Sequence, residues 1–212
     1  MPVNSQGRLF VISGPSGVGK GTVLARFLKD RPDVRLSVSA TTRSPRPGER
    51  NGESYFFLGR EEFEDKISAG GMLEYAQYNN EYYGTPRAAV ESWVREGYDV
   101  ILEIEVQGAM QVRARWPEAV LVFIMPPDFE TLRARLSGRG TEDEQTIRKR
   151  LSAAVRELKS AGDYDFVLVN DTVEGAAQAL GGILESAKYL VKTNQTFIME
   201  VMKDAEAEPV AN

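Results

Sequence analysis

Apolar runs and helical patterns alternate along most of the chain. Four nearly continuous apolar runs have the composition of buried parallel strands: RLFVISG (8–14), DVILEIE (99–105), AVLVFIM (119–125) and DFVLVN (165–170). Apolar residues at helical spacing predict helices over about 20–29, 87–96, 107–115, 129–136, 141–162 and 173–191. In the 141–162 helix, the predicted apolar stripe is Ile147, Leu151, Val155 and Leu158. The alternation predicts an α/β fold with a parallel sheet wrapped by helices on both faces.

Residues 35–85 break this rhythm. The segments RLSVSATTR, ESYFFLG, MLEYAQYN and EYYGTP are short, aromatic and separated by turn residues, with one helical segment, EEFEDKISAGG, among them. This pattern predicts a small mixed α/β lobe inserted into the parallel core. The irregular segment SGRGTED (137–143) lies between two helices and predicts a flap. After about Lys192 the chain closes on DAEAEPVAN, which we expect to be frayed or disordered.

Composition removes several kinds of chemistry. The 212 residues include no cysteine and no histidine, which excludes disulfides, thiol nucleophiles, imidazole bases and histidine-ligated metals. The N-terminal MPVNSQGR has no apolar stretch, and no apolar run approaches the ~20 residues that span a bilayer. We therefore expect a soluble cytoplasmic protein without a signal peptide or a membrane partner.

The overall charge of the chain is not typical of a nucleic-acid-binding protein. The formal net charge is −5, which disfavours bulk nucleic-acid binding. Of the 26 cationic residues, 18 are arginine and 8 are lysine. Arginine makes bidentate phosphate contacts, although the excess alone is also consistent with genome composition.

The first apolar run leads into GPSGVGKGT, which resembles the phosphate-binding loop G-x-x-x-x-G-K-[ST]. A strand precedes the loop and a helix follows it, so its backbone N–H groups and the helix N-terminus are available to phosphate oxygens. The lysine is expected to reach the β- and γ-phosphates. The predicted ATP-binding loop consists of Gly14, Pro15, Ser16, Gly17, Val18, Gly19, Lys20, Gly21 and Thr22.

The loop departs from the motif at one position. Gly21 stands where a hydroxyl normally ligates Mg²⁺, and Thr22 comes one residue later. Because Mg²⁺ readily keeps several waters, we expect phosphate oxygens and waters to hold it, with the carboxylate of Glu103 bracing the waters. Glu103 and Glu105 alternate along one predicted strand, so they face opposite ways unless the strand end twists.

An arginine cluster lies in the predicted lobe. Arg43, Arg46 and Arg50 fall within eight residues, on a loop stiffened by Pro45 and Pro47. Three guanidinium groups repel one another unless an anion lies among them or water screens them. The cluster therefore predicts an anion site, with a solvated loop as the alternative. The nearby Tyr55, Tyr82 and Tyr83 are candidates for additional hydroxyl donors or for the core of the lobe.

These segments together resemble the guanylate kinases of bacteria. The resemblance covers the phosphate loop, TTRSPRPGE, EYYGTP, LEIEVQG, and RGT followed by RKRL, in that order, over about residues 8–190. It implies a P-loop NTPase-type core (8–34, 86–136 and 160–190), a GMP-binding lobe (35–85), a lid (137–159) and a C-terminal tail (191–212). It also implies transfer of the γ-phosphate of ATP to GMP with Mg²⁺, and small molecules as the only partners.

The resemblance also implies roles for particular residues. Arg43, Arg46, Tyr55 and Tyr83 are expected to hold the GMP phosphate. Ser39, Glu74, Thr85 and Glu105 are expected to recognise guanine, which presents N1–H and N2–H donors that suit carboxylates. Lys20, Arg139 and Arg150 are the expected catalytic residues, and Asn170 is expected near the adenine.

The absence of histidine agrees with this reaction, because a phosphate monoester is largely dianionic at neutral pH and needs no base.

Three other functions remain open. A phosphopeptide-binding scaffold of the same fold would not need the catalytic cations that are present here. A GTPase would need an N-K-x-D motif, which the chain lacks. A kinase that acts on another mononucleotide would differ from a guanylate kinase only in the residues that recognise the base.

Overall fold

A five-stranded parallel sheet forms the core of the computed structural model, which describes residues 6–137 and 144–207. The strand order is β2-β7-β1-β8-β9. The four strands predicted from apolar runs are confirmed as β1 (Leu9–Ser13), β7 (Asp99–Glu103), β8 (Val120–Met125) and β9 (Phe166–Val169). The fifth, β2 (Val34–Leu36), pairs with β7, although its residues were assigned mainly to the inserted lobe. It is only three residues long and only Val34 is buried, so no apolar run marks it.

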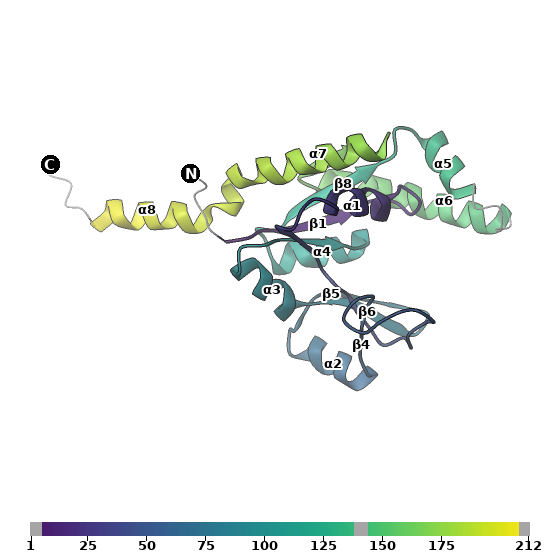
Figure 1. Ribbon diagram of the computed structural model, residues 1–212, viewed down its shortest axis with the longest axis horizontal. Coiled ribbons are helices and arrows are strands. Elements are labelled where there is room, and N and C mark those ends of the chain that lie inside the picture. Colours follow the sequence, from purple (N-terminus) through teal and green to yellow (C-terminus); the bar gives the residue numbers. More distant parts are fainter. Residues whose placement is uncertain (1–5, 138–143, 208–212) are drawn as a thin grey trace.

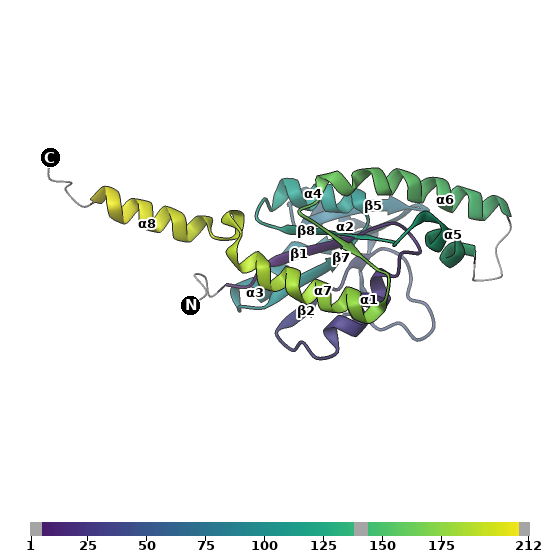
Figure 2. The same ribbon diagram turned by 90° about the horizontal axis from the view of Figure 1, so that it is seen from above.

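Helices cover both faces of this sheet, as predicted. Phe10 and Ile12 of β1 point to one face, and their neighbours Leu9 and Val11 point to the other. The first face packs against α1 (Lys20–Leu28), α5 (Phe129–Ser137), α6 (Glu144–Leu158) and α7 (Val173–Ser186). The second packs against α3 (Arg87–Arg95) and α4 (Val106–Arg115). Figures 1 and 2 show the resulting three-layer arrangement.

One detail of the predicted α6 stripe is wrong. Ala154 is fully buried, and Leu151 and Leu158 pack against the core beside it, whereas Val155 is 40% exposed. The buried line follows i, i+3 and i+7, which leaves Val155 on the outer face. The first three residues of the predicted helix, 141–143, lie outside the described residues, and the helix ends in a 3₁₀ segment, η1 (Lys159–Asp163).

The inserted lobe is a mixed sheet, as expected. Its order is β4 (Phe56–Phe57), β3 (Ala40–Thr41), β6 (Glu81–Pro86) and β5 (Met72–Tyr78). The turn from β5 to β6 is the pair Asn79–Asn80, both at positive φ, as a two-residue hairpin requires. The helix α2 (Arg60–Ser68) packs Phe63 flat on the ring of Tyr82, with centroids 5.2 Å apart. In Figure 1 this lobe lies on the side of α3 and α4.

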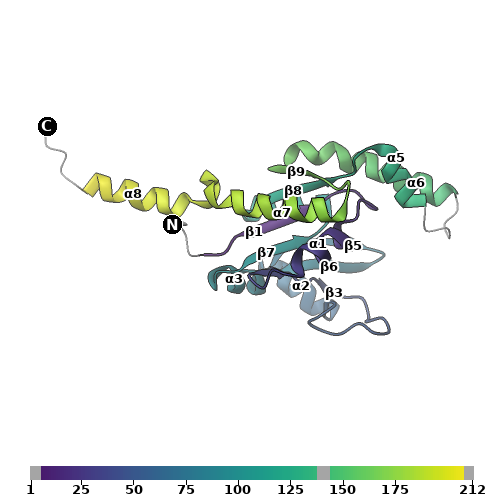
Figure 3. The same cartoon turned by 45° about the horizontal axis from the view of Figure 1, so that its top comes forward.

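The C-terminal region differs from the expectation. After α7 come two 3₁₀ turns, η2 (Ala187–Tyr189) and η3 (Val191–Thr193), and then a helix, α8 (Gln195–Ala207). Much of the segment expected to be frayed is therefore helical, because Phe197, Ile198, Val201 and Met202 recur at helical spacing before the polar close. No residue of α8 is buried, and Figures 2 and 3 show it extending away from the body.

Among residues 6–137 and 144–207, no helix is both long and apolar enough to cross a membrane.

Candidate active site

The loop from β1 to α1 has a backbone that only glycine adopts easily. Gly14, Gly17 and Gly19 have φ values of 152°, 82° and 94°. Gly19 is the N-cap of α1, and no side chain caps the helix. The first turn of α1 also carries no acidic residue. Its N-terminal amides and positive dipole end are therefore available to an anion.

Lys20 is held inside this loop. Its Nζ donates to the carbonyl oxygens of Gly14 (2.6 Å) and Pro15 (3.3 Å). Burial lowers the pKa of Lys20, while the negative charges of Glu103, Glu157 and Glu105 act in the opposite direction. The three carboxylates thus favour the charged form of this partly desolvated ammonium group at the loop.

The carboxylate of Glu103 lies beside the position that lacks the hydroxyl. A Cβ built on Gly21 would be 3.6 Å and 3.9 Å from the two carboxylate oxygens of Glu103. Glu103 ends β7, and Glu105 is already the N-cap of α4, so strand alternation does not extend to Glu105. The expectation of opposite faces held only for a regular strand, and here the charges of both carboxylates act on Lys20. Burial raises the pKa of Glu103, and the charge of Lys20 opposes this shift.

Asn170 braces the phosphate loop. It is 3% exposed at the end of β9, and its Nδ2 donates to the carbonyl oxygen of Val18 at 2.7 Å. Arg135 of α5 donates to the same carbonyl at 3.2 Å and to the Asn170 carbonyl at 3.1 Å. Arg135 was not among the predicted site residues, since no local pattern relates it to a loop 117 residues away.

The helix α6 reaches the loop at Ser16. Arg150 Nη2 lies 3.3 Å from Ser16 Oγ, and Glu157 Oε2 accepts a hydrogen bond from the Ser16 N–H at 3.2 Å. The two α6 residues are seven positions apart and share a face of the helix. Glu157 was not predicted, and the predicted catalytic Arg139 lies outside the described residues.

In the lobe, two predicted residues form a buried polar pair. Glu74 and Thr85 are 6% and 1% exposed, and Thr85 Oγ1 donates to Glu74 Oε1 at 2.7 Å. Burial raises the pKa of Glu74, while the hydrogen bond from Thr85 and the charge of Arg115 lower it. A desolvated carboxylate of this kind accepts hydrogen bonds strongly and discriminates against groups that offer no donor.

The arginine loop contains its own anion. Glu49 accepts two hydrogen bonds from the Arg43 guanidinium, both at 2.9 Å, and one from the Arg46 N–H at 2.7 Å. The hydrogen bond with Glu49 raises the pKa of Arg43, and the same bond lowers the pKa of Glu49. The sequence predicted an anion site or a solvated loop here and did not identify Glu49, although it is only six residues from Arg43.

Aromatic rings line the same part of the lobe. The Arg43 guanidinium lies 5.4 Å from the centre of the Tyr55 ring, which meets the Tyr83 ring edge-on at 6.2 Å. The structure therefore brings Arg43, Tyr55 and Tyr83 together. Three other predicted residues lie outside these contacts: Ser39 is half-buried, and Arg46 and Thr22 are exposed.

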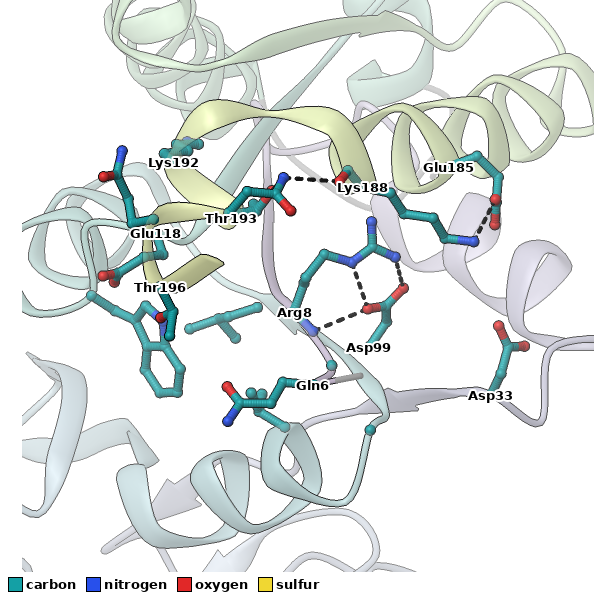
Figure 4. A pocket seen from close by; sticks show the side chains of 17 residues that line it. Gln6, Arg8, Asp33, Asp99, Glu118, Glu185, Lys188, Lys192, Thr193 and Thr196 are labelled. Carbon is teal, nitrogen blue, oxygen red and sulfur yellow. Dashed lines mark hydrogen bonds and ion pairs between the residues drawn. The ribbon is translucent and has the colours of Figure 1, made fainter. Parts of the chain in front are cut away.

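A cavity in the described part of the chain lies away from these residues. It has a volume of about 590 Å³ and is lined in part by Arg8, Asp99, Lys188 and Lys192, near the amino end of β1 and the root of α8. Figure 4 shows Arg8 bound to Asp99 and Lys188 bound to Glu185. These two pairs neutralise part of its charge, whereas the predicted phosphate loop, Glu103 and Asn170 lie at the carboxyl ends of β1, β7 and β9, where α/β sheets bind ligands.

Comparison with known proteins agrees with this geometry. A family model described as guanylate kinase matches residues 6–187. The guanylate kinase of Clostridioides difficile (strain 630) is 47% identical over 199 residues, covering 94% of this chain and 97% of that protein. That of Lactiplantibacillus plantarum is 49% identical over 203 residues, covering 95% and 98%. A crystal structure of guanylate kinase from Anaplasma phagocytophilum superposes with a TM-score of 0.71 at 33% identity, covering 91% of this chain and 92% of that one.

Proposed function

The chain belongs to the guanylate kinase family, and we propose that its cleft transfers the γ-phosphate of ATP to GMP, releasing ADP and GDP. One combination of features carries the proposal. A phosphate loop with an uncapped helix and a half-buried lysine occurs together with a lobe that holds a buried carboxylate–threonine pair and an aligned arginine.

In this proposal the phosphate loop, residues 14–22, binds the ATP phosphates through backbone amides, with Lys20 as the charged group. Asn170 and Arg135 keep the loop in shape by holding the Val18 carbonyl. In the proposed complex, the adenine lies near Asn170.

GMP occupies the lobe. Arg43, Arg46, Tyr55 and Tyr83 bind its phosphate, and Ser39 contributes to recognition of the guanine. Glu74, oriented by Thr85, accepts from the donors of guanine together with Glu105. An adenine ring offers an acceptor at N1, so it would leave a buried carboxylate facing a lone pair.

The reaction needs charge neutralisation rather than a base. The attacking GMP phosphate is largely dianionic at neutral pH, because its second pKa is about 6. Two polyanions must meet in line, with charge spread over the transferred phosphoryl oxygens. Lys20 and Arg150 provide positive charge at the loop, and Arg139 is the third proposed contributor.

The residues present also suit Mg²⁺ held largely through water. Among residues 6–137 and 144–207, no cluster of three or more acidic side chains could enclose a metal ion. The Glu103 carboxylate lies next to Gly21, where a hydroxyl ligand is missing, and can hold metal-bound waters. When bound, Mg²⁺ would help to neutralise the negative charge of the ATP phosphates.

A coupled assay of ADP release tests the function directly. With ATP and a panel of nucleoside monophosphates, we expect turnover with GMP and little with AMP, UMP or dTMP. The variant Glu74→Ala should raise the KM for GMP by ~10–100-fold, because hydrogen bonds to charged groups contribute about 1.5–3 kcal/mol. It should also reduce the preference for GMP over AMP.

Two outcomes would reject the proposal. No turnover with any monophosphate, while GMP still binds in calorimetry, would favour the phosphopeptide-binding scaffold. Turnover that is fastest with another monophosphate would indicate a kinase with a different base preference. An unchanged GMP:AMP ratio in Glu74→Ala would remove Glu74 from base recognition.

A further inference from the structure

One residue of the lobe sheet has its outer backbone hydrogen bonds supplied by a side chain from outside the sheet. β5 lies at the end of the order β4-β3-β6-β5, and Tyr75 of β5 faces Gly84 of β6 on the inner side. On the outer side, the side-chain amide of Gln111 in α4 takes the place of a neighbouring strand. Gln111 Oε1 accepts from the Tyr75 N–H at 3.2 Å, and Nε2 donates to the Tyr75 carbonyl at 2.9 Å. Without Gln111 both edge groups would lose this pairing.

A second residue on the same face of α4 holds the same strand. Arg115, one turn after Gln111, donates through Nη1 to the carbonyls of Met72 (3.2 Å) and Leu73 (3.0 Å). Its guanidinium also lies 5.5 Å from the centre of the Tyr75 ring. Two successive turns of one core helix therefore grip the segment of β5 on both sides of Glu74.

Gly108 brings the Glu74 carboxylate against the first turn of α4. A Cβ at Gly108 would lie 2.7 Å from Glu74 Oε2, so only glycine allows this approach. The same helix has Glu105 as its N-cap. One rigid element thus carries Glu105 at its start and fixes Glu74 by contacts with the neighbouring backbone.

We propose that Gln111 is a positioning residue for guanine specificity, which fixes Glu74 relative to Glu105 without touching GMP. The inference rests on the proposed function, in which both carboxylates accept from the N1–H and N2–H donors of guanine. If Tyr75 shifts, Glu74 moves with it and loses its alignment with the N2–H donor. The loss is largest for a base that carries both donors.

Inosine monophosphate makes this a selective test, because it differs from GMP only by the missing N2 amino group. In full-length Gln111→Ala, we expect kcat/KM for GMP to fall ~10-fold, the size of one weakened hydrogen bond to a charged group. The value for inosine monophosphate should fall no more than about twofold. The KM for ATP should stay unchanged, since the phosphate loop does not depend on this contact.

Two further variants separate positioning from general damage. Gln111→Met keeps the volume of the side chain but removes both hydrogen bonds, so it should reproduce the loss of GMP preference even if Gln111→Ala is too unstable to assay. Gln77→Ala is the matched control, since Gln77 is also on β5 but its side chain hydrogen-bonds to Asn80 in the hairpin turn and not to α4. It should behave as the parent protein.

Equal losses for GMP and inosine monophosphate in Gln111→Met would overturn the proposal, as would a parallel loss of ATP binding in calorimetry. An unchanged GMP preference would do the same. Failure of the proposed function is distinguishable, because in that case the parent protein itself would release no ADP with GMP.

Discussion

Two loops in this molecule carry the proposed phosphate contacts, and they are built by different means. The phosphate loop, residues 14–22, uses backbone amides, three glycines at positive φ and one lysine. The arginine loop, residues 43–50, uses side chains, and Glu49 aligns Arg43 before any ligand arrives. The phosphate loop depends on backbone conformations that several neighbouring residues adopt together. The arginine loop depends on the pairing of side chains within the lobe. The two loops should therefore fail in different ways when altered.

The largest expected effect distinguishes a loss of turnover (kcat) from a loss of substrate binding (KM). Lys20→Ala should lower kcat by ~10²–10³-fold, as for the loss of one preorganised charge-stabilising donor, with little change in the KM for GMP. Arg43→Ala should instead raise the KM for GMP by ~10–100-fold and change kcat much less. Steady-state kinetics with each substrate varied separately measures both effects. Lys29→Ala, at the exposed end of the same helix as Lys20, is the control.

Should both variants change kcat and the GMP KM in the same proportion, the two loops would not have the separate roles that their contacts suggest.

A smaller effect is expected from the aligning carboxylate. Glu49→Gln keeps the shape of the side chain but weakens its hold on Arg43, so the KM for GMP should rise by ~2–10-fold, the cost of ordering a flexible side chain on binding. The KM for ATP should not change. Glu53→Gln provides the comparison, because Glu53 belongs to the same region but contacts only the exposed Arg50, at 3.8 Å. A lower KM for GMP would mean that Glu49 competes with the phosphate instead of aligning Arg43.

The smallest effect concerns the hydroxyl missing from the phosphate loop. In Gly21→Ser the new side chain fits, because its Cβ would make ordinary contacts with Glu103. One added oxygen ligand should lower the Mg²⁺ concentration for half-maximal ATP binding by roughly twofold to fivefold, since Mg²⁺ keeps most of its waters. Calorimetry of ATP binding over a Mg²⁺ series measures this, with Gly182→Ser on the exposed face of α7 as the control. If the Mg²⁺ dependence does not shift, neither Glu103 nor position 21 contributes to binding the metal.

The sequence predicted the core well because its signals are local. Continuous apolar runs located β1, β7, β8 and β9, and helical spacing located the helices around them. Where the signal was weak the prediction failed: β2 has only one buried residue, and α8 was judged by its polar last residues instead of its apolar spacing. Val155 was placed on the buried stripe because spacing alone does not fix which side of a wide stripe meets the core.

The candidate site shows the same contrast between residues with a local sequence signal and residues without one. The phosphate loop is one continuous segment, so its identity could be read directly from the order of its residues. Glu49, Arg135, Glu157 and Gln111 could not be identified in this way. Each is an ordinary polar residue in sequence, and its importance comes from the partner that the fold brings to it.

By itself, the sequence determined the alternation of strands and helices, the inserted lobe, the phosphate loop and the absence of imidazole or thiol chemistry, since these depend on residue type and on neighbours along the chain. Only the tertiary structure decided that Glu103 lies beside Gly21, that α6 contacts Ser16, and that α4 holds the strand carrying Glu74. Hydrogen bonds and charge pairs act over a few ångströms, and residues far apart in the chain come within that range only after packing has fixed the elements that carry them.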